Sequence, residues 1–369
     1  MYDKTEQEIM KNWKGDALKP VVSIPTITYN HEKYISEAID GLLMQETNFP
    51  FEVVVGEDCS LDGTRKIVEK YIEKYPNIIR LVTSENNVGM HLNGIRTIKV
   101  CKGEYVAICE GDDYWTDPLK LQNQVDFLEK NEEYGMVHTN FDTYYQDSNY
   151  FLKNTHSVYN IDIKDNCTLE YWNLFGKAMA TIKTLTVCIR RDLTDEWLSV
   201  TPESKWLIGD FPMYFYASLH SKIGYINEST SVYRTAPNGS ASNVGNDSKK
   251  KLKIKKTYVD IRLHFFVKYK LDEKTFKKAL IRDFNLLFDY CIITGNEVVL
   301  DEYFEILTNL KWQHAANKLS RIYSKSNSPT KKLFLQYLTK IKLFILERLI
   351  KLFNRKLLVT SLQRKLFCI

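Results

Sequence analysis

Apolar runs and amphipathic segments alternate between residues 20 and 128. Four runs rich in apolar residues have the length of buried strands, at 21–27, 51–58, 78–83 and 105–109. Between and after them, apolar residues recur three and four positions apart, as on one helix face, at 34–45, 62–72, 89–102 and from Pro118 onward. Strands separated by such helices predict right-handed βαβ units and a mostly parallel sheet flanked by helices.

The pattern changes after residue 128. Residues 135–235 are mixed, with short strand-like pieces at 184–191 and 231–234. A Gly/Ser/Asn-rich stretch at 236–247 closes this half, and the remaining sequence looks helical almost throughout. We therefore predict an α/β domain at 18–243 followed by a helical C-terminal region at 244–369.

Composition narrows the class of protein. The 369 residues are 44% hydrophobic and 26% charged, which is ordinary for a globular protein. Seven scattered cysteines without a C-x-x-C pair argue against a zinc site or a secreted disulfide framework. Residues 1–17 lack a signal peptide's apolar core, and no uncharged run of about 18 apolar residues occurs. We expect a cytoplasmic protein.

Polar side chains follow three of the predicted strands. Tyr29 and Asn30 follow the first strand, Glu57 and Asp58 end the second, and three acids at 110–113 follow the fourth. Ligands of parallel sheets bind outside the carboxyl ends of the strands, so these positions predict a binding site.

The acids after the fourth strand, Glu110, Asp112 and Asp113, place three carboxylates within four residues. Because like charges repel and buried charge is costly, such a group usually faces a cation. Mg²⁺ is held through one or two carboxylates, water and substrate phosphates, which predicts a phosphorylated small molecule as ligand. The alternative is a solvated turn in which Thr116 or Asp117 caps the next helix, but a cap explains only one acid.

The carboxylates of Glu57 and Asp58 also allow two interpretations. Either could accept a hydrogen bond from a nucleobase imide N–H or from sugar hydroxyls. Alternatively, they form a plain strand end before a helix capped by Ser60 or Asp62. Their position beside the first acid group favours the shared site.

Four ordered motifs carry a resemblance to a known family: SIPTITYNHEKYISEAIDGLLMQ, EVVVGEDCSLDGT, NNVG and CKGEYVAICEGDDYWTDPLKLQNQ. Over about residues 20–240 they resemble the family 2 glycosyltransferases, inverting enzymes with the GT-A fold. The similarity is closest to bacterial members that build capsule, O-antigen or other cell-surface polysaccharides. The resemblance implies a nucleotide-sugar donor, often UDP-linked, and Mg²⁺ or Mn²⁺ as cofactor.

The resemblance assigns roles by position at the first two strand ends. Tyr29 and Asn30 fall in the family's first donor-binding loop. Asp58 falls where the family holds the nucleobase, with Glu57 just before it.

The family's D-x-D motif falls on Glu110-Gly111-Asp112. Asp112 is then the leading metal ligand, with Asp113 beside it in the donor site. Glu110 replaces the first aspartate, and its longer carboxylate can still reach the ribose or a metal-bound water.

Sugar transfer also needs a base for the acceptor hydroxyl. Asp210 lies about 100 residues past the acids, where the family places its catalytic aspartate. The alternative is an N-cap for a helix at 211–219. Trp206 could stack on a sugar face, although an aromatic residue in an apolar segment is more often core.

The stretch at 232–242 resembles a loop in which related enzymes carry a Tyr-Arg pair and then a His. Tyr233 and Arg234 are present, but no His follows them. Arg234 remains a candidate for a bidentate contact with a donor phosphate.

The basic charge lies at one end of the sequence. Residues 331–369 carry a net charge of +9 and the rest −4, and the 331–356 segment has one apolar helical stripe flanked by cations. This pattern predicts a helix on an anionic membrane surface, which would suit a lipid-linked acceptor. Alternatives are a helix packed on the catalytic domain or on a dimer partner. Nucleic acid is not expected, since no binding module is recognisable.

We therefore predict a metal-dependent, inverting GT-A glycosyltransferase, peripheral on the inner face of the cell membrane. A metal-dependent nucleotidyltransferase and a non-catalytic membrane assembly protein of the same fold are the alternatives. A dinucleotide or P-loop enzyme is disfavoured because neither glycine motif occurs.

Overall fold

The computed structural model describes residues 2–158, 182–200, 206, 208–235 and 247–271, together with Leu287, Cys291 and residues 298–299. By its contacts the chain divides into two compact units, Met1–Asn243 and Val244–Ile369. The predicted basic membrane helix at 331–369 and nearly all of the 236–247 stretch lie outside the described residues.

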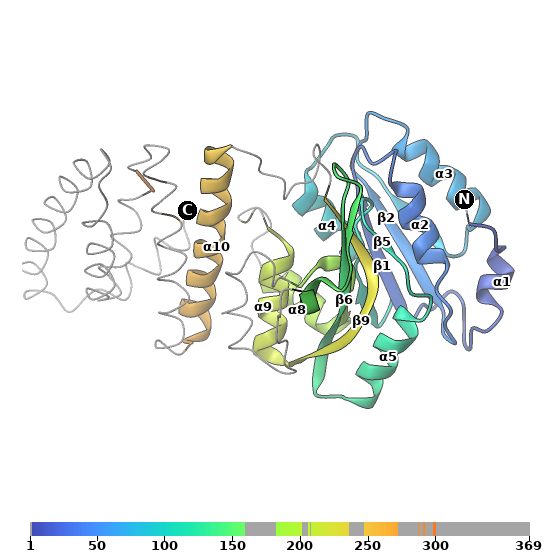
Figure 1. The fold of residues 1–369 in the computed structure, drawn as a ribbon. Helices are drawn as coiled ribbons and strands as arrows, with labels where there is room; N and C mark the ends of the chain where they lie inside the picture. Colours follow the sequence, from blue (N-terminus) through green and yellow to red (C-terminus); the bar gives the residue numbers. More distant parts are fainter. Residues whose placement is uncertain are drawn as a thin grey trace, which may run out of the picture. The chain divides into compact units, whose positions relative to one another are not determined.

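The first unit begins with four parallel strands, in the order β3-β2-β1-β4. They are β1 (Val22–Thr28), β2 (Phe51–Glu57), β3 (Ile79–Val82) and β4 (Tyr105–Ala107). Their crossover helices are α2 (Ile35–Leu43), α3 (Thr64–Lys74) and α4 (Met90–Lys99). Figure 1 shows α2 and α3 on one side of these strands and α4 on the other. The predicted βαβ units are confirmed, and both faces of β2 are buried, as its continuous apolar run requires.

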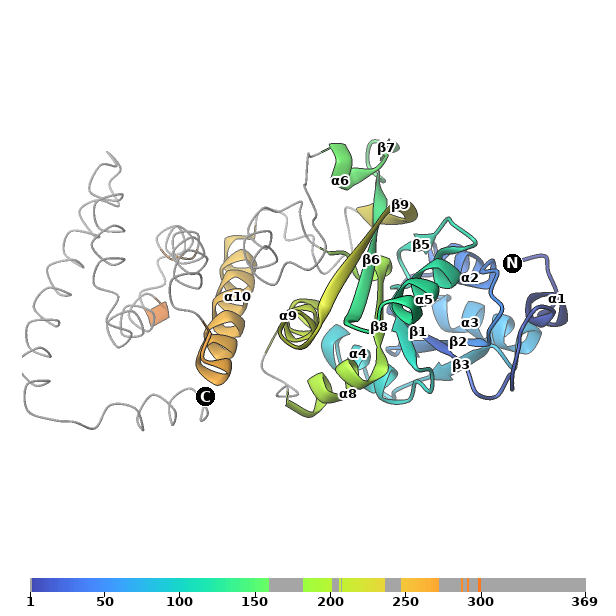
Figure 2. The ribbon, with the colours of Figure 1, turned by 90° about the horizontal axis from the view of Figure 1, so that it is seen from below.

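The later strands make the sheet mixed. They are β5 (Tyr114–Trp115), β6 (Tyr134–Tyr145), β7 (Tyr150–Leu152), β8 (Val187–Arg190) and β9 (Lys222–Thr235). Strand β8 lies between β4 and β6 and is antiparallel to both, whereas β9 runs parallel to β6 (Figure 2). Strand β9 also pairs with β5, which brings its carboxyl end beside the acids that follow β4. A mixed α/β sheet with flanking helices results.

The remaining elements of the described part are mostly helices. They are α1 (Glu6–Met10), α5 (Lys120–Lys130), α6 (Thr155–Val158), the 3-10 turn η1 (Thr184–Thr186), α8 (Arg191–Val200), α9 (Asp210–His220) and α10 (Ser248–Tyr269). Asp247 caps α10 by accepting hydrogen bonds from the amides of Lys249 and Lys250. Among the described residues, none of the helices is both long enough and apolar enough to cross a membrane.

The predicted cap of α5 at Thr116 or Asp117 is wrong. The helix begins at Lys120, with Leu119 in the N-cap position. The amides of Thr116 and Asp117 instead donate to the carbonyl of Thr230 in β9, which keeps both residues in extended backbone beside the sheet. The carboxylate of Asp117 accepts from the Leu119 amide, so it shapes the turn that leads into the helix.

Lys120, the first residue of α5, is fully buried. Its ammonium lies 4.2 Å from the centre of the Trp115 ring and donates a hydrogen bond to Gln124. Burial lowers the pKa of Lys120 to about 8. The unfolded chain therefore binds more protons than the folded chain between pH 8 and 10.5, and stability from this group rises with pH there.

We expect the wild type to gain stability relative to Lys120→Met as the pH rises from 7.5 to 9.5, by about 1 kcal/mol per pH unit. Urea unfolding at three pH values measures the difference in unfolding free energy between the two proteins. The contributions of the other titrating groups are common to both and cancel in this difference. The exposed Lys130→Met in the same helix should show no such slope. A flat difference for Lys120→Met would contradict the assignment.

Candidate active site at the carboxyl ends of the strands

The ends of three strands meet around β1. The amide of Asp58, after β2, donates to the Thr28 carbonyl over 3.1 Å, and the amide of Gly111, after β4, donates to the Ile27 carbonyl over 2.9 Å. A Cβ at Gly111 would lie 2.9 Å from the Thr28 side chain, so this close approach requires glycine. The structure thus brings the polar groups that follow β1, β2 and β4 to one edge.

The loops after β1 and β2 are bonded to each other. Asn30 has a φ of 55°, and its Oδ1 accepts from the Leu61 amide over 2.8 Å. Its own amide donates to the Ser60 hydroxyl. The Asn30 side chain therefore stabilises the contact between the two loops. Tyr29 beside it is 38% exposed and available to a ligand.

Helix α3 has Gly63 as its N-cap and no side-chain cap, so the predicted cap by Ser60 or Asp62 is wrong. Asp62 instead accepts from the Glu32 amide, in the loop after β1, and from the amide of Thr64, the first residue of α3.

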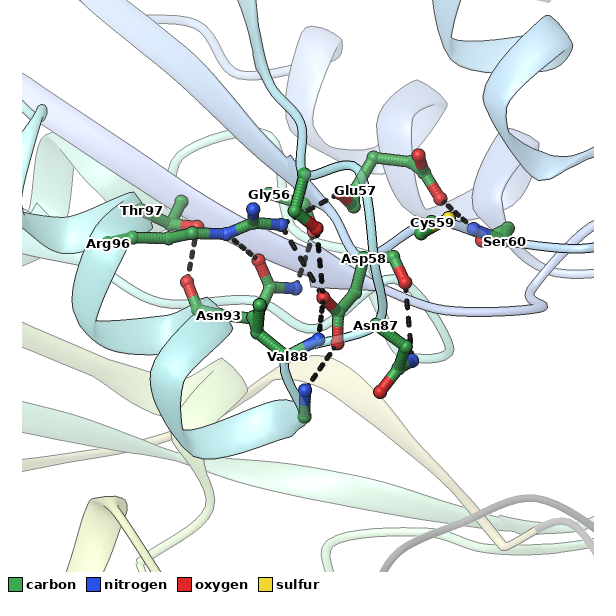
Figure 3. Close-up of polar contacts among 12 residues, drawn as sticks. Gly56, Glu57, Asp58, Cys59, Ser60, Asn87, Val88, Asn93, Arg96 and Thr97 are labelled. Carbon is green, nitrogen blue, oxygen red and sulfur yellow. Dashed lines mark hydrogen bonds and ion pairs between the residues drawn. The ribbon is translucent and has the colours of Figure 1, made fainter. Parts of the chain in front are cut away.

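Asp58 is bonded on both oxygens (Figure 3). Its Oδ1 accepts from the Val88 amide and its Oδ2 from the Gly89 amide, each over 2.9 Å, and Arg96 lies 3.6 Å away. The side chain is 3% exposed. Asp58 therefore fixes the loop that starts α4, and a nucleobase would have to compete with these amides for it.

Glu57 keeps one acceptor open. Its Oε1 accepts from the Ser60 amide over 2.6 Å, while its Oε2 is buried without a hydrogen-bond partner among the described residues. In Figure 3 its side chain points away from Arg96 and Asn93, on the opposite side of the strand end.

The three acids after β4 differ in their surroundings. Thr184 donates to Glu110, and the Arg234 amide donates to Asp113 over 2.7 Å. Burial raises the pKa of Glu110 to about 7, and it also raises the pKa of Asp113, which the charges of Asp112 and Glu110 raise further. The Asp112 carboxylate accepts no hydrogen bond from the described residues, and His31 lies within electrostatic range of it.

Arg234 secures this acid loop. Its Nε donates to the Asp112 carbonyl over 2.9 Å, and its terminal nitrogen pairs with Glu37. The guanidinium also lies over three tyrosine rings at 4.9–5.5 Å, those of Tyr34, Tyr114 and Tyr144. A phosphate contact, predicted from the sequence, would have to be shared with these partners.

Asp210 is the first residue of α9 and joins the acids from a distant part of the sequence. Its charge raises the pKa of Glu110, and burial raises its own pKa. Gly209 is the N-cap, so the prediction of Asp210 as the cap of this helix is wrong. Among the described residues its Oδ1 accepts from the adjacent Phe211 amide alone. Trp206 is buried, as the core alternative predicts.

Sequence patterns missed two residues beside the acids. Lys183 lies within electrostatic range of Asp113, Asp210 and Glu110, and burial lowers its pKa while these charges raise it. The buried Tyr214 hydroxyl lies within electrostatic range of Asp210 and Glu110, whose charges raise its pKa beyond the increase caused by burial. A lone lysine and a tyrosine in an apolar helix give no pattern from which these positions could be predicted.

Some of the buried polar side-chain atoms that have no hydrogen-bond partner among the described residues belong to this region. In the described part of the chain they include Thr28 Oγ1, His31 Nδ1, Glu57 Oε2, His91 Nε2 and the Tyr214 hydroxyl. Leaving such atoms unpaired costs about 1–3 kcal/mol each, and native proteins rarely do so without a reason. A polar ligand that supplies the missing partners is the simplest reason.

The donor set fits a divalent cation that arrives with phosphates. No three His, Cys, Asp or Glu side chains of the described residues form a ready-made metal site. Asp112 is the carboxylate left without a hydrogen bond, and Mg²⁺ or Mn²⁺ commonly takes one or two protein carboxylates, water and substrate phosphates. Asp112 would hold the cation, with the remaining ligands supplied by water and the incoming diphosphate.

Residues 23–191 match the family model described as "Glycosyl transferase family 2". An uncharacterised protein of Mycobacterium tuberculosis is 46% identical over 112 residues, which are 30% of this chain and 32% of that protein. TuaG of Bacillus subtilis, named as a candidate glycosyltransferase of teichuronic acid biosynthesis, is 35% identical over 119 residues, 32% of this chain and 44% of its own. The chain thus spans less than half the length of these relatives.

Solved structures share the fold at low identity. S. aureus TarS 1–349 in complex with UDP-GlcNAc aligns with a TM-score of 0.56 and 22% identity, over 73% of this chain and 72% of that chain. A mannosyltransferase from Pyrobaculum calidifontis in complex with GDP-Man and Mn²⁺ aligns with a TM-score of 0.51 and 17% identity, over 95% and 93%. At these identities the likeness supports the GT-A-like fold.

Proposed function

We propose, from the match of residues 23–191 to glycosyl transferase family 2, that the protein transfers a sugar from a nucleotide-sugar donor to an acceptor hydroxyl. The observation that carries the proposal is an acid cluster beside buried polar atoms, such as Thr28 Oγ1 and Glu57 Oε2, that have no hydrogen-bond partner among the described residues. A nucleotide-sugar offers phosphates, sugar hydroxyls and a base edge, which could satisfy these atoms together.

We propose UDP as the nucleotide. TarS, which shares the fold, was solved with UDP-GlcNAc and with UDP, whereas the mannosyltransferase was solved with GDP-Man. The open Oε2 of Glu57 is an acceptor for a nucleobase imide N–H, and the half-exposed Tyr29 ring offers a surface on which a base could stack. Asp58 and Asn30 would hold the two flanking loops.

The proposed mechanism needs a base close to the donor. A cation held by Asp112 would stabilise the negative charge of the departing diphosphate. Asp210 takes the proton of the acceptor hydroxyl as that oxygen attacks the anomeric carbon from the opposite side, so the anomeric configuration inverts. Burial, which raises the pKa of Asp210, makes the carboxylate a stronger base.

The acceptor we propose is a saccharide or a lipid-linked saccharide in cell-surface polysaccharide assembly. The name of TuaG supports this context, and EpsE, a second Bacillus subtilis relative named as a candidate glycosyltransferase, is 32% identical over 120 residues. The basic segment at 331–369 supports a peripheral position at an anionic membrane surface.

Calorimetric titration of UDP, with GDP and CDP as controls, with and without Mn²⁺, tests the proposed donor site. Binding of UDP that requires Mn²⁺ would support it and justify a screen of UDP-sugars. Glycoside plus free nucleoside diphosphate as products would separate a transferase from a nucleotidyltransferase, which releases pyrophosphate. If no nucleotide bound in the presence of Mn²⁺, the proposal would lose its basis.

The Tyr214 hydroxyl allows a separate prediction. Because the hydroxyl is buried and has no hydrogen-bond partner among the described residues, Tyr214→Phe should keep or raise the unfolding free energy, by up to about 1 kcal/mol. If the hydroxyl meets the substrate, kcat/KM should fall about 10-fold or more. The control is Tyr216→Phe in the same helix, whose hydroxyl donates to Glu196 and whose loss should lower stability instead. Unchanged turnover in Tyr214→Phe would exclude the substrate contact.

A further inference from the structure

Lys183 is the charged side chain of the site to which no role has been assigned. It precedes η1, and its ammonium lies 4.0 Å from the centre of the Tyr233 ring. The residues next to these two are bonded to the acid cluster, since Thr184 donates to Glu110 and the Arg234 amide donates to Asp113. Two independent segments therefore place the ammonium beside the acids.

The ammonium group has unused hydrogen-bond donors. It is within electrostatic range of Asp113, Asp210 and Glu110, yet none of the described residues accepts a hydrogen bond from its nitrogen or lies within the 4.0 Å of an ion pair. A lysine ammonium carries three N–H donors, which lose hydration when the side chain is enclosed. A ligand with several acceptor oxygens would satisfy them.

Charge balance indicates which ligand that is. The carboxyl groups of Glu110, Asp112, Asp113 and Asp210 lie within electrostatic range of one another, and those that are ionised repel an anion. Arg234, a second cation beside the cluster, is already engaged by Glu37, a backbone carbonyl and three tyrosine rings. Lys183, by contrast, has no hydrogen-bond acceptor among the described residues, so its donors are open for a diphosphate.

We propose that Lys183 is a positioning residue for the donor diphosphate and, before the donor binds, the protein's own counter-ion for the acid cluster. This inference rests on the proposed function, because the diphosphate is that of the nucleotide-sugar. The ammonium would donate to the phosphate oxygens beside the cation held by Asp112, and the two positive groups would then share the charge of the bound diphosphate.

The proposal has two parts, and they predict that Lys183→Met changes the affinities for Mn²⁺ and for UDP in opposite directions. Without nucleotide, removal of the positive charge leaves the cluster more negative, so Mn²⁺ should bind about 3- to 10-fold more tightly. With saturating Mn²⁺, UDP should bind about 10-fold or more weakly, because a charge-assisted contact with the diphosphate is gone. Electron paramagnetic resonance of free Mn²⁺ and calorimetry of UDP measure the two affinities in the full chain.

Two further variants control for local structure. Lys183→Arg keeps the charge and should leave the Mn²⁺ affinity near that of the wild type while restoring most of the UDP affinity. Lys222→Met removes another lysine that lies over a tyrosine ring, 5.6 Å from Tyr134 and away from the acids, and should change neither affinity.

The outcomes are separable. Opposite shifts in Lys183→Met, with rescue by arginine, would support the proposal. A loss of both affinities would indicate a merely structural lysine, and unchanged affinities would show that it does not act on the site; either would overturn the inference. Failure of the wild type itself to bind nucleotide would instead count against the proposed function.

Discussion

Asp210→Asn is expected to lower kcat by at least about 1,000-fold while UDP still binds in the presence of Mn²⁺. Asparagine keeps the size and the local hydrogen bond of the side chain but cannot take a proton from the acceptor hydroxyl. In the described part of the chain, the Asp210 carboxylate accepts from its neighbouring amide alone, so its replacement removes no contact between segments there. The effect should therefore fall on turnover and leave donor affinity within a few-fold.

Asp192 provides a matched control for Asp210→Asn. Asp192 also lies in the first turn of its helix and accepts from the next amide, of Leu193, over 2.8 Å, as Asp210 does from Phe211, but it is exposed and belongs to α8. Asp192→Asn should leave turnover and stability unchanged. If Asp210→Asn retained more than about a tenth of the wild-type kcat, Asp210 would not be the base.

The first four strands and their helices could be predicted from the sequence because their periodicity is strong and local. Each strand is a short apolar run, and each helix buries one face. The end of each strand then fixes which polar residues share an edge. Hence the positions of Asp58, Glu110 and Asp112 at one edge of the sheet could be predicted without knowledge of any contact.

Which partner each polar group takes could not be predicted, because that depends on segments far apart in the sequence. Asp58 is occupied by two amides from the turn before α4, which no pattern around EDCS indicates. Arg234 is occupied by Glu37, 197 positions away. Predictions of helix caps also failed where tertiary contacts determine the backbone, as at Thr116, whose amide donates to a carbonyl of β9.

The acid cluster also changes the question of what compensates its charge. Sequence alone indicates a cation from outside the protein, because three carboxylates stand within four residues. The fold adds Lys183 and Arg234 from two other segments, so part of the compensation is internal. Removal of divalent cations from the wild type should therefore lower the affinity for the donor more than it lowers the free energy of unfolding. We expect substitution of Asp112, the proposed protein ligand of the metal, to weaken donor binding most.

Asp112→Asn is accordingly expected to weaken Mn²⁺-dependent UDP binding by at least about 100-fold, since removal of groups that only orient metal ligands already costs 10- to 100-fold. The carboxylate accepts no hydrogen bond from the described residues, and the Asp112 carbonyl, which binds Arg234, is retained. Unfolding free energy should therefore change by less than about 0.5 kcal/mol. Asp117 follows β5, and its carboxylate accepts from the Leu119 amide. Asp117→Asn removes the same charge outside the cluster and should bind UDP like the wild type. Equal UDP affinity in Asp112→Asn and the wild type would mean that the metal is held elsewhere, whereas a large loss of stability would indicate a structural carboxylate.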